Sequence, residues 1–148
     1  MIDRELLPLA LLQANEREEI EGRTRMQKLV FLIQEEFENA DSRLPGTYTY
    51  IPYDYGPFAR ELYDDLDRLK ERGVITEERV EMSDGTYKYN YRLTDEAEDY
   101  ISRVQQEKLE KTRQLADQIK SEFNDTRLPD LLDYVYAEYP EYAENSVL

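Results

Sequence analysis

Six basic side chains could neutralise the phosphates of a nucleic acid, and they come from three segments of the chain. Three of them crowd the first turns of a helix predicted over residues 23–37. One lies on a second helix, predicted over residues 57–72, and two lie on a β-hairpin predicted over residues 76–93. Each contact with a phosphate releases counterions and so adds to affinity for DNA. The candidate DNA-contacting residues are Arg23, Arg25, Lys28, Arg60, Lys88 and Arg92.

The residue types that most enzymes need are missing. The chain has no histidine and no cysteine, which removes the commonest general base, the usual zinc ligands and the thiolate nucleophile. Asp64, Asp65 and Asp67 lie around a predicted helix, where solvation and pairing with Arg68 and Arg72 explain them better than metal binding does. The sequence also lacks a glycine-rich phosphate loop. It therefore predicts a protein that is not an enzyme and binds no cofactor or metal.

The net charge works against binding to nucleic acid. The 148 residues carry a formal charge of −15 at pH 7, whereas DNA-binding proteins usually carry a surplus of lysine and arginine. The acidic excess could reflect a salt-rich environment, in which case it says nothing about the partner. Alternatively, the acidic body carries a locally neutral or basic face, to which the six side chains above would contribute.

The elements that would position these side chains can be placed by turn and helix signals. Gly56 and Pro57 predict the start of the second helix, because glycine adopts turn conformations and proline fits a first helical turn. Gly73 predicts its end, and Asp84 with Gly85 predicts the turn of the hairpin. Upstream, residues 4–14 predict a leucine-rich core helix, and the acidic residues 15–22 predict a solvated connection.

Four segments in a fixed order carry a resemblance to known families: GRTRMQKLVFLIQ, YIPYDYGPFARELYDDLDRL, GVI and YRLT. Together they resemble the YwgA-like family of small winged-helix proteins over roughly residues 4–105. MQKLVFL with YGPF is more distantly similar to the SocA-type antitoxin (Panacea) domains. The resemblance implies an α+β, mainly helical fold, with a winged helix-turn-helix domain and a C-terminal helical extension. A strand over residues 47–53 is then expected to join the hairpin in a three-stranded sheet.

The resemblance implies two alternative functions. The first is a DNA-binding transcriptional regulator, with helix 57–72 in the major groove of double-stranded DNA and the hairpin on the backbone. The second is an antitoxin-like or adaptor module that binds a protein partner and not DNA. For Gln27 and Lys28, the alternative to ligand contact is structural. They could hydrogen-bond the loop at residues 53–56 and hold the two halves of the domain together.

The C-terminal part predicts a second unit. A helix over residues 94–123 would extend beyond a small domain, so we expect a winged-helix domain over residues 1–105 and a helical extension over residues 106–148. Its apolar stripe would be bare in a monomer, which predicts a homodimer. The alternative is a helical hairpin that folds back on the same chain. The candidate dimerisation residues are Leu115, Ile119, Phe123, Leu131 and Val135.

Three features of the sequence bear on location. No apolar run is long enough to span a membrane. The first residues carry charge and are followed by too short an apolar run for a secretory signal, and the lack of cysteine excludes disulfides. We therefore expect a cytoplasmic protein without a membrane partner.

Overall fold

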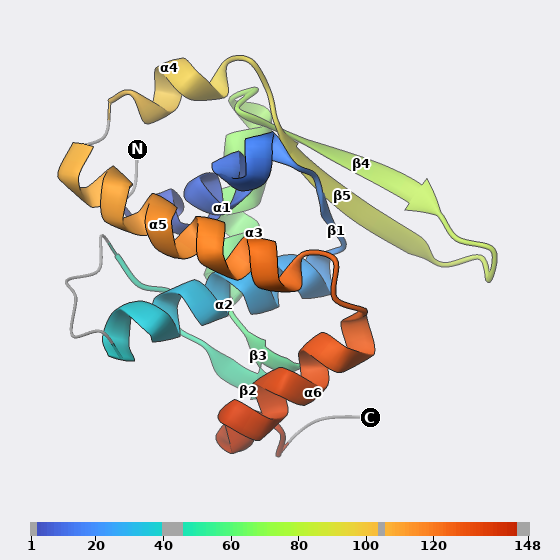
Figure 1. Cartoon of the computed structure of the whole chain (residues 1–148). Helices are drawn as coiled ribbons and strands as arrows, with labels where there is room; N and C mark the ends of the chain where they lie inside the picture. Colours follow the sequence, from blue (N-terminus) through green and yellow to red (C-terminus); the bar gives the residue numbers. More distant parts are fainter. Residues whose placement is uncertain (1–2, 40–45, 104–105, 145–148) are drawn as a thin grey trace.

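The computed structural model describes residues 3–39, 46–103 and 106–144 of the chain (Figure 1). Helices predominate, accompanied by small antiparallel sheets, which confirms the predicted α+β, mainly helical class. At the centre lies α1 (Leu6–Arg17), which follows a short 3-10 helix η1 (Asp3–Glu5). The helices α2 (Arg23–Asn39) and α5 (Gln106–Phe123) pack against α1. Leucines of α1 are buried on all sides of the helix, as expected of a core helix.

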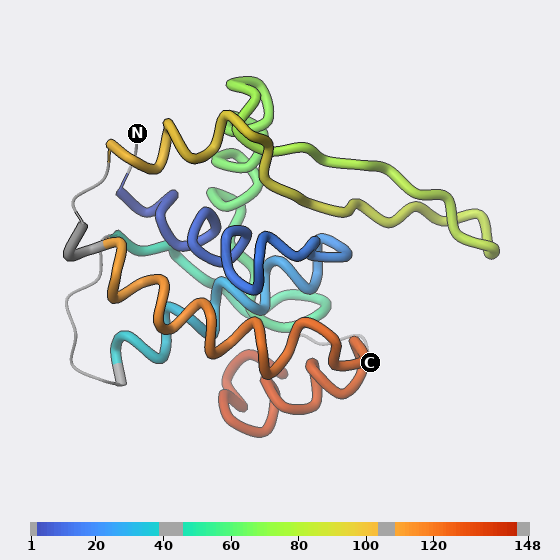
Figure 2. Tube along the Cα trace, turned by 45° about the horizontal axis from the view of Figure 1, so that its top comes forward, coloured from blue at the N-terminus to red at the C-terminus, as the bar shows by residue number. Residues whose placement is uncertain are grey.

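The larger sheet contains the predicted hairpin. It consists of β1 (Ile20–Glu21), β4 (Ile75–Glu81) and β5 (Tyr87–Leu93) in the order β1-β5-β4, all antiparallel. The β4–β5 hairpin extends away from the helical body (Figure 2). Asp84 closes its turn by accepting a hydrogen bond from the backbone N–H of Thr86 at 3.0 Å. The hairpin and its turn were therefore predicted correctly.

The third strand of this sheet differs from the prediction. It is not residues 47–53 but Ile20–Glu21, which lies in the segment expected to be a solvated connection. Ile20 is fully buried and pairs with Tyr91 of β5. The predicted third strand of the sheet is therefore wrong. Ile20 forms the strand because its burial stabilises the pairing more than the acidic residues around it favour solvent. The winged-helix assignment stays a prediction.

Residues 51–58 form a separate small hairpin. Its strands are β2 (Ile51–Tyr53) and β3 (Gly56–Phe58), paired so that Pro52 lies opposite Pro57. Neither proline has an N–H to donate, which suits a two-stranded sheet with open edges. The predicted helix start at Pro57 is wrong for this reason, and α3 (Arg60–Glu71) begins three residues later. Its predicted end at Gly73 is confirmed, with φ +75°.

The predicted helix over residues 94–123 is not continuous. It consists of α4 (Ala97–Ile101), a turn at Ser102 and Arg103, and α5. After α5 the chain turns back through α6 (Leu128–Glu138) and η2 (Pro140–Tyr142) and packs on α2 (Figure 1).

The apolar stripe proposed for dimerisation is covered within the chain. Ile119, Phe123, Leu131 and Val135 are each at most 6% exposed, and Leu115 packs half-buried against the same core. The expectation of a bare stripe is therefore wrong, and the fold-back alternative describes this packing. One hydrophobic cluster runs from α1 to α6 across residue 105, where the two predicted units were divided.

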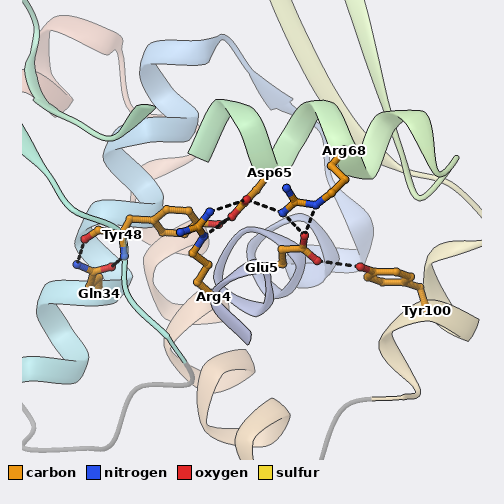
Figure 3. A network of polar contacts seen from close by, with 7 residues as sticks. All are labelled: Arg4, Glu5, Gln34, Tyr48, Asp65, Arg68 and Tyr100. Atoms are coloured by element: carbon orange, nitrogen blue, oxygen red, sulfur yellow. Dashed lines mark hydrogen bonds and ion pairs between the residues drawn. The ribbon is translucent and has the colours of Figure 1, made fainter. Parts of the chain in front are cut away.

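Asp65 of α3 anchors a polar network inside the fold (Figure 3). Its carboxylate is fully buried. It accepts hydrogen bonds from Arg4 at 2.8 and 3.0 Å, from the Tyr48 hydroxyl at 2.7 Å and from Arg68 at 2.6 Å. The interpretation of this carboxylate as a solvated helix residue is wrong, whereas its neighbours Asp64 and Asp67 are exposed.

The network continues to the first turn of the chain. Arg68 also donates to the buried carboxylate of Glu5 at 2.6 and 3.2 Å, and Glu5 accepts from the Tyr100 hydroxyl at 2.8 Å. Burial raises the pKa of Tyr100 to about 12, together with its bond to Glu5. The network thus ties η1, α3 and α4 together.

Within the described ranges, none of the helices combines the length and the apolar character that crossing a membrane requires.

Candidate functional site

The six predicted DNA-contacting residues do not form one basic face. The guanidinium of Arg23 lies 3.8 Å from the ring centroid of Tyr89, donates to the Tyr91 hydroxyl at 3.3 Å and lies 3.6 Å from the carboxylate of Glu77. It is therefore engaged by the sheet on three sides. When a guanidinium is stacked on a ring and paired with a carboxylate, the carboxylate offsets its positive charge. Such a guanidinium attracts a phosphate only weakly.

The hairpin cations and the α3 cation lie apart from each other. Lys88 pairs with Glu21 at 3.3 Å, and Arg92 pairs with Glu19 at 3.1 Å. Arg60 is exposed at the start of α3 and has no ion-pair partner among the described residues. Exposed pairs of this kind contribute little to stability, yet they cancel the local positive charge.

Arg25 and Arg92 are brought together at an open cleft of about 500 Å³ between β1, β5 and the end of α5. Arg25 donates to the Phe123 carbonyl at 2.9 Å. Arg17 and Arg127 line the same cleft, but Glu18, Glu19, Glu21 and Asp125 line it as well. The cleft is therefore mixed in charge.

Gln27 and Lys28 join α2 to the β2–β3 hairpin. The Gln27 amide donates to the Ala59 carbonyl at 2.9 Å and accepts from the Ala59 N–H at 3.0 Å. Lys28 Nζ donates to the Pro57 carbonyl at 2.9 Å. The structural interpretation of this pair is confirmed, although the bonds reach residues 57 and 59 and not the loop at 53–56.

Lys28 also lines a cavity of about 220 Å³ between α2, α3 and the hairpin. The ammonium is buried, with 2% of the residue exposed. Burial alone lowers the pKa of Lys28 to about 7, and no carboxylate offsets that cost. The cavity wall is otherwise largely aromatic. Its main lining residues are Gln27, Lys28, Tyr53, Tyr55, Phe58 and Tyr63.

The β2–β3 hairpin beside this cavity carries the most exposed apolar side chains in the described part of the chain, apart from the tip of the β4–β5 hairpin. Ile51, Tyr53 and Tyr55 are 49%, 50% and 47% exposed. Phe58 stacks on Tyr53 with ring centroids 5.0 Å apart and meets Tyr63 edge-on at 5.4 Å. We refer to Ile51, Tyr53 and Tyr55 as the rim. The sequence analysis missed it, because the tyrosines that alternate in residues 47–53 are Tyr48 and Tyr50, which pack into or against the core.

Gly56 brings the hairpin close to α6 and Lys28. Its φ is +93°, and a Cβ there would lie 3.0 Å from Cε1 of Tyr136 and 3.5 Å from Cε of Lys28. Changing Gly56 to alanine should lower the free energy of unfolding by about 2–3 kcal/mol, because an unfavourable backbone conformation and a crowded contact add.

Gly73→Ala is the matched control for this change. Gly73 also has a positive φ, but nothing lies within 4 Å of its added Cβ. Urea unfolding should therefore show a loss of only about 1 kcal/mol for Gly73→Ala. Equal losses for the two variants would contradict close packing at Gly56.

The structure places no group of three or more acidic, histidine or cysteine side chains within metal-binding reach of one another in the ranges it describes. The functional surface is thus made of an aromatic rim, a buried ammonium and backbone groups.

Comparison with known proteins identifies a family for this chain. A search of curated proteins finds no match to the chain. A scan of family models matches residues 26–141 to the family described as "Antitoxin SocA-like, Panacea domain". The match begins at Met26, in the MQKLVFL motif, includes YGPF and extends through α5 and α6. The resemblance to YwgA-like proteins stays a prediction. Since the matched segment makes up well over half of the chain, the protein belongs to the SocA-like Panacea domain family.

Proposed function

We propose that the protein is an antitoxin-like module that neutralises a protein partner by binding it through the rim. The observation that carries this proposal is the exposure of Ile51, Tyr53 and Tyr55, each about half exposed, on one small hairpin, where Tyr53 and Tyr55 line a cavity. Tyrosine is enriched at the energetic centres of protein interfaces, because it offers a large apolar area and a hydroxyl at low entropic cost. The antitoxin description of the family supports a protein partner.

The state of the basic residues favours this function over a DNA-binding regulator. Arg23, Lys28, Lys88 and Arg92 are each bonded to groups of their own chain. Arg60 shares the surface of α3 with exposed Asp64 and Asp67, on a chain of net charge −15. Affinity for DNA depends on cations free to replace counterions, and these are mostly engaged.

The experiment is a growth assay with the genes that neighbour this one. Each neighbour is expressed alone to find a product that arrests growth, and then together with this chain. We expect the wild type to restore growth and to co-purify with that product. Tyr53→Asp combined with Tyr55→Asp should weaken the complex at least about tenfold, since a charge at an interface centre costs several kcal/mol.

The matched control is Tyr87→Asp. Tyr87 is 48% exposed, like the rim tyrosines, but lies at the far end of the β4–β5 hairpin. The Tyr87→Asp variant should bind the partner as tightly as the wild type does. The contrary outcome has two parts. No neighbour arrests growth, and the protein retards duplex DNA in a mobility-shift assay, with an affinity that falls steeply as salt rises and when Lys88 and Arg92 are changed to alanine. In that case the protein is a DNA-binding regulator.

A further inference from the structure

Lys28 is a buried cation without an anion. The only acceptor recorded for its ammonium among the described residues is the Pro57 carbonyl, at 2.9 Å. Ions inside proteins are normally paired, because an unpaired charge loses its hydration without compensation. In this protein the buried carboxylates of Asp65 and Glu5 contact arginines. The buried ammonium of Lys120 has no ion pair among the described residues either, but three backbone carbonyls accept its hydrogen bonds. Lys28 differs in having one such acceptor and in lying at the wall of a cavity.

The ammonium has unused donors. A lysine Nζ carries three protons when charged, and Pro57 accepts one of them. The Gln27 amide is bonded through both its oxygen and its nitrogen to the backbone of Ala59, and within the described part of the chain it makes no hydrogen bond to Lys28. A ligand that enters the cavity and offers an oxygen would therefore bond to Lys28.

The groups that face Lys28 from the neighbouring elements are phenols and not carboxylates. They are the tyrosines of the β2–β3 hairpin, of α3 and of α6. Arg23 contacts the other side of this wall: its guanidinium lies 5.5 Å from the centroid of the Tyr63 ring and is already paired with Glu77. The facing residues are Tyr53, Tyr55, Tyr63 and Tyr136.

We propose that the partner protein inserts one aspartate or glutamate side chain into this cavity, where its carboxylate pairs with the Lys28 ammonium and its flanking residues cover the rim. This inference rests on the proposed function and specifies the contact. A single carboxylate matches the single charge at the site. A phosphate, with up to two negative charges, would be only half compensated, and the acidic body of the protein would repel the remainder. The volume of about 220 Å³ accommodates one side chain.

The proposal predicts a coupling between binding and pH. In the free protein, burial holds the pKa of Lys28 at about 7. A carboxylate at hydrogen-bond distance raises that pKa, so binding takes up a proton at higher pH. In the pH range between the pKa of Lys28 in the free protein and its higher pKa in the complex, the affinity for the partner falls about tenfold for each pH unit. We therefore expect at least tenfold weaker binding at pH 9 than at pH 6.5.

The test is NMR of the full chain carrying ¹³C- and ¹⁵N-labelled lysine, with the Lys28 signal assigned through Lys28→Met. The probes are two peptides, acetyl-Phe-Glu-Phe-amide and its glutamine counterpart, and inorganic phosphate. We expect the free Lys28 to titrate near 7, and the glutamate peptide to raise its pKa by at least one unit. The glutamine peptide should leave it unchanged, and phosphate should have a smaller effect.

Several outcomes would overturn the proposal. A free pKa near 10 would mean that the chain already supplies a counter-ion. An equal response to the glutamine peptide would remove the carboxylate from the contact, and an equal response to phosphate would make the site a general anion site. No response at millimolar peptide would leave the cavity without the proposed ligand. None of these measurements requires a variant to fold, beyond the one used for assignment.

The partner found in the growth assay separates this proposal from the proposed function. Lys28→Met keeps the apolar stem, and Lys111→Met on the exposed face of α5 is its control. We expect Lys28→Met to bind the partner at least tenfold more weakly at pH 6.5 and to lose the pH dependence. If it binds as Lys111→Met does while the rim variant fails, the carboxylate contact is wrong and the proposed function stands.

Discussion

Changing Asp65 to asparagine should lower the free energy of unfolding by about 3–5 kcal/mol, the usual cost of breaking a buried ion pair from one side. The asparagine keeps the size of the side chain but offers one acceptor oxygen where Arg4, Tyr48 and Arg68 now share two. The NH₂ group of the asparagine would face guanidinium donors of these residues, with which it cannot form hydrogen bonds. Since domains of this size are typically stable by about 5–15 kcal/mol, the variant should be close to unfolding at moderate temperature.

The adjacent residue provides the control. Asp64→Asn makes the same chemical change one position earlier, at an exposed side chain. Urea unfolding at pH 7 should place Asp64→Asn within about 0.5 kcal/mol of the wild type. A loss of less than about 1 kcal/mol for Asp65→Asn would mean that Arg4 and Arg68 find other acceptors, and that the network of Figure 3 contributes little.

The same carboxylate makes stability depend on acid pH. Burial by itself raises the pKa of Asp65, but the hydrogen bonds from Arg4, Tyr48 and Arg68 outweigh it and hold the pKa below its ordinary value of 3.8. The unfolded chain therefore binds this proton at higher pH than the folded chain does. The contribution of Asp65 is complete above about pH 4 and is lost as pH falls through the lower folded value. Asp65→Asn should flatten the stability curve in that range, and Asp64→Asn should not.

The buried position of Asp65 was visible in the sequence, but its partners were not. It lies three residues after Leu62 and four before Leu69, which are both buried, so helical spacing places it on the inner face of α3. Its charge suggested solvent instead. The compensating arginine, Arg4, is 61 positions away. Local signals correctly predicted the end of α3 at Gly73 and the hairpin turn at Asp84, because such residues determine the backbone within a few positions.

Long-range pairing explains the remaining differences between sequence and structure. A two-residue strand such as Ile20–Glu21 has no detectable periodicity, and it exists because Ile20 pairs with Tyr91. Lys28 lies off the apolar stripe of α2, and it is buried because the β2–β3 hairpin covers the other face of that helix. The site was therefore indicated by the Gln27-Lys28 and Gly56-Pro57 motifs, whereas its cavity and rim follow only from tertiary contacts.

The second large effect is expected at Lys120, whose Nζ holds the non-helical turn at the C-terminal end of α1. The residue is 1% exposed, and Nζ donates to the carbonyls of Leu12 at 3.3 Å, Ala14 at 2.8 Å and Glu18 at 2.5 Å. The backbone between them is unusual, since residues 15–17 are three consecutive non-glycine residues with positive φ. Such conformations cost about 1–2 kcal/mol each and persist only where surrounding contacts over-determine them. Lys120 supplies those contacts from α5.

Changing Lys120 to methionine should lower the free energy of unfolding by about 3–5 kcal/mol, because carbonyls left without a donor in the interior cost about 1–3 kcal/mol each and the strained turn loses its anchor. Part of that loss is offset, since burial already disfavours the charge and lowers the pKa of Lys120 to about 8. Lys111→Met, exposed on the same helix, should be nearly neutral.

Amide hydrogen exchange adds a local readout. The N–H of Glu18, which bonds to the Asn15 carbonyl at 3.1 Å, should exchange faster in Lys120→Met than the global loss of stability explains. Equal stability of the two methionine variants would mean that water can replace the ammonium, and that the left-handed turn is held by other contacts, such as the bond from Ser121 of α5 to the Asn15 side chain.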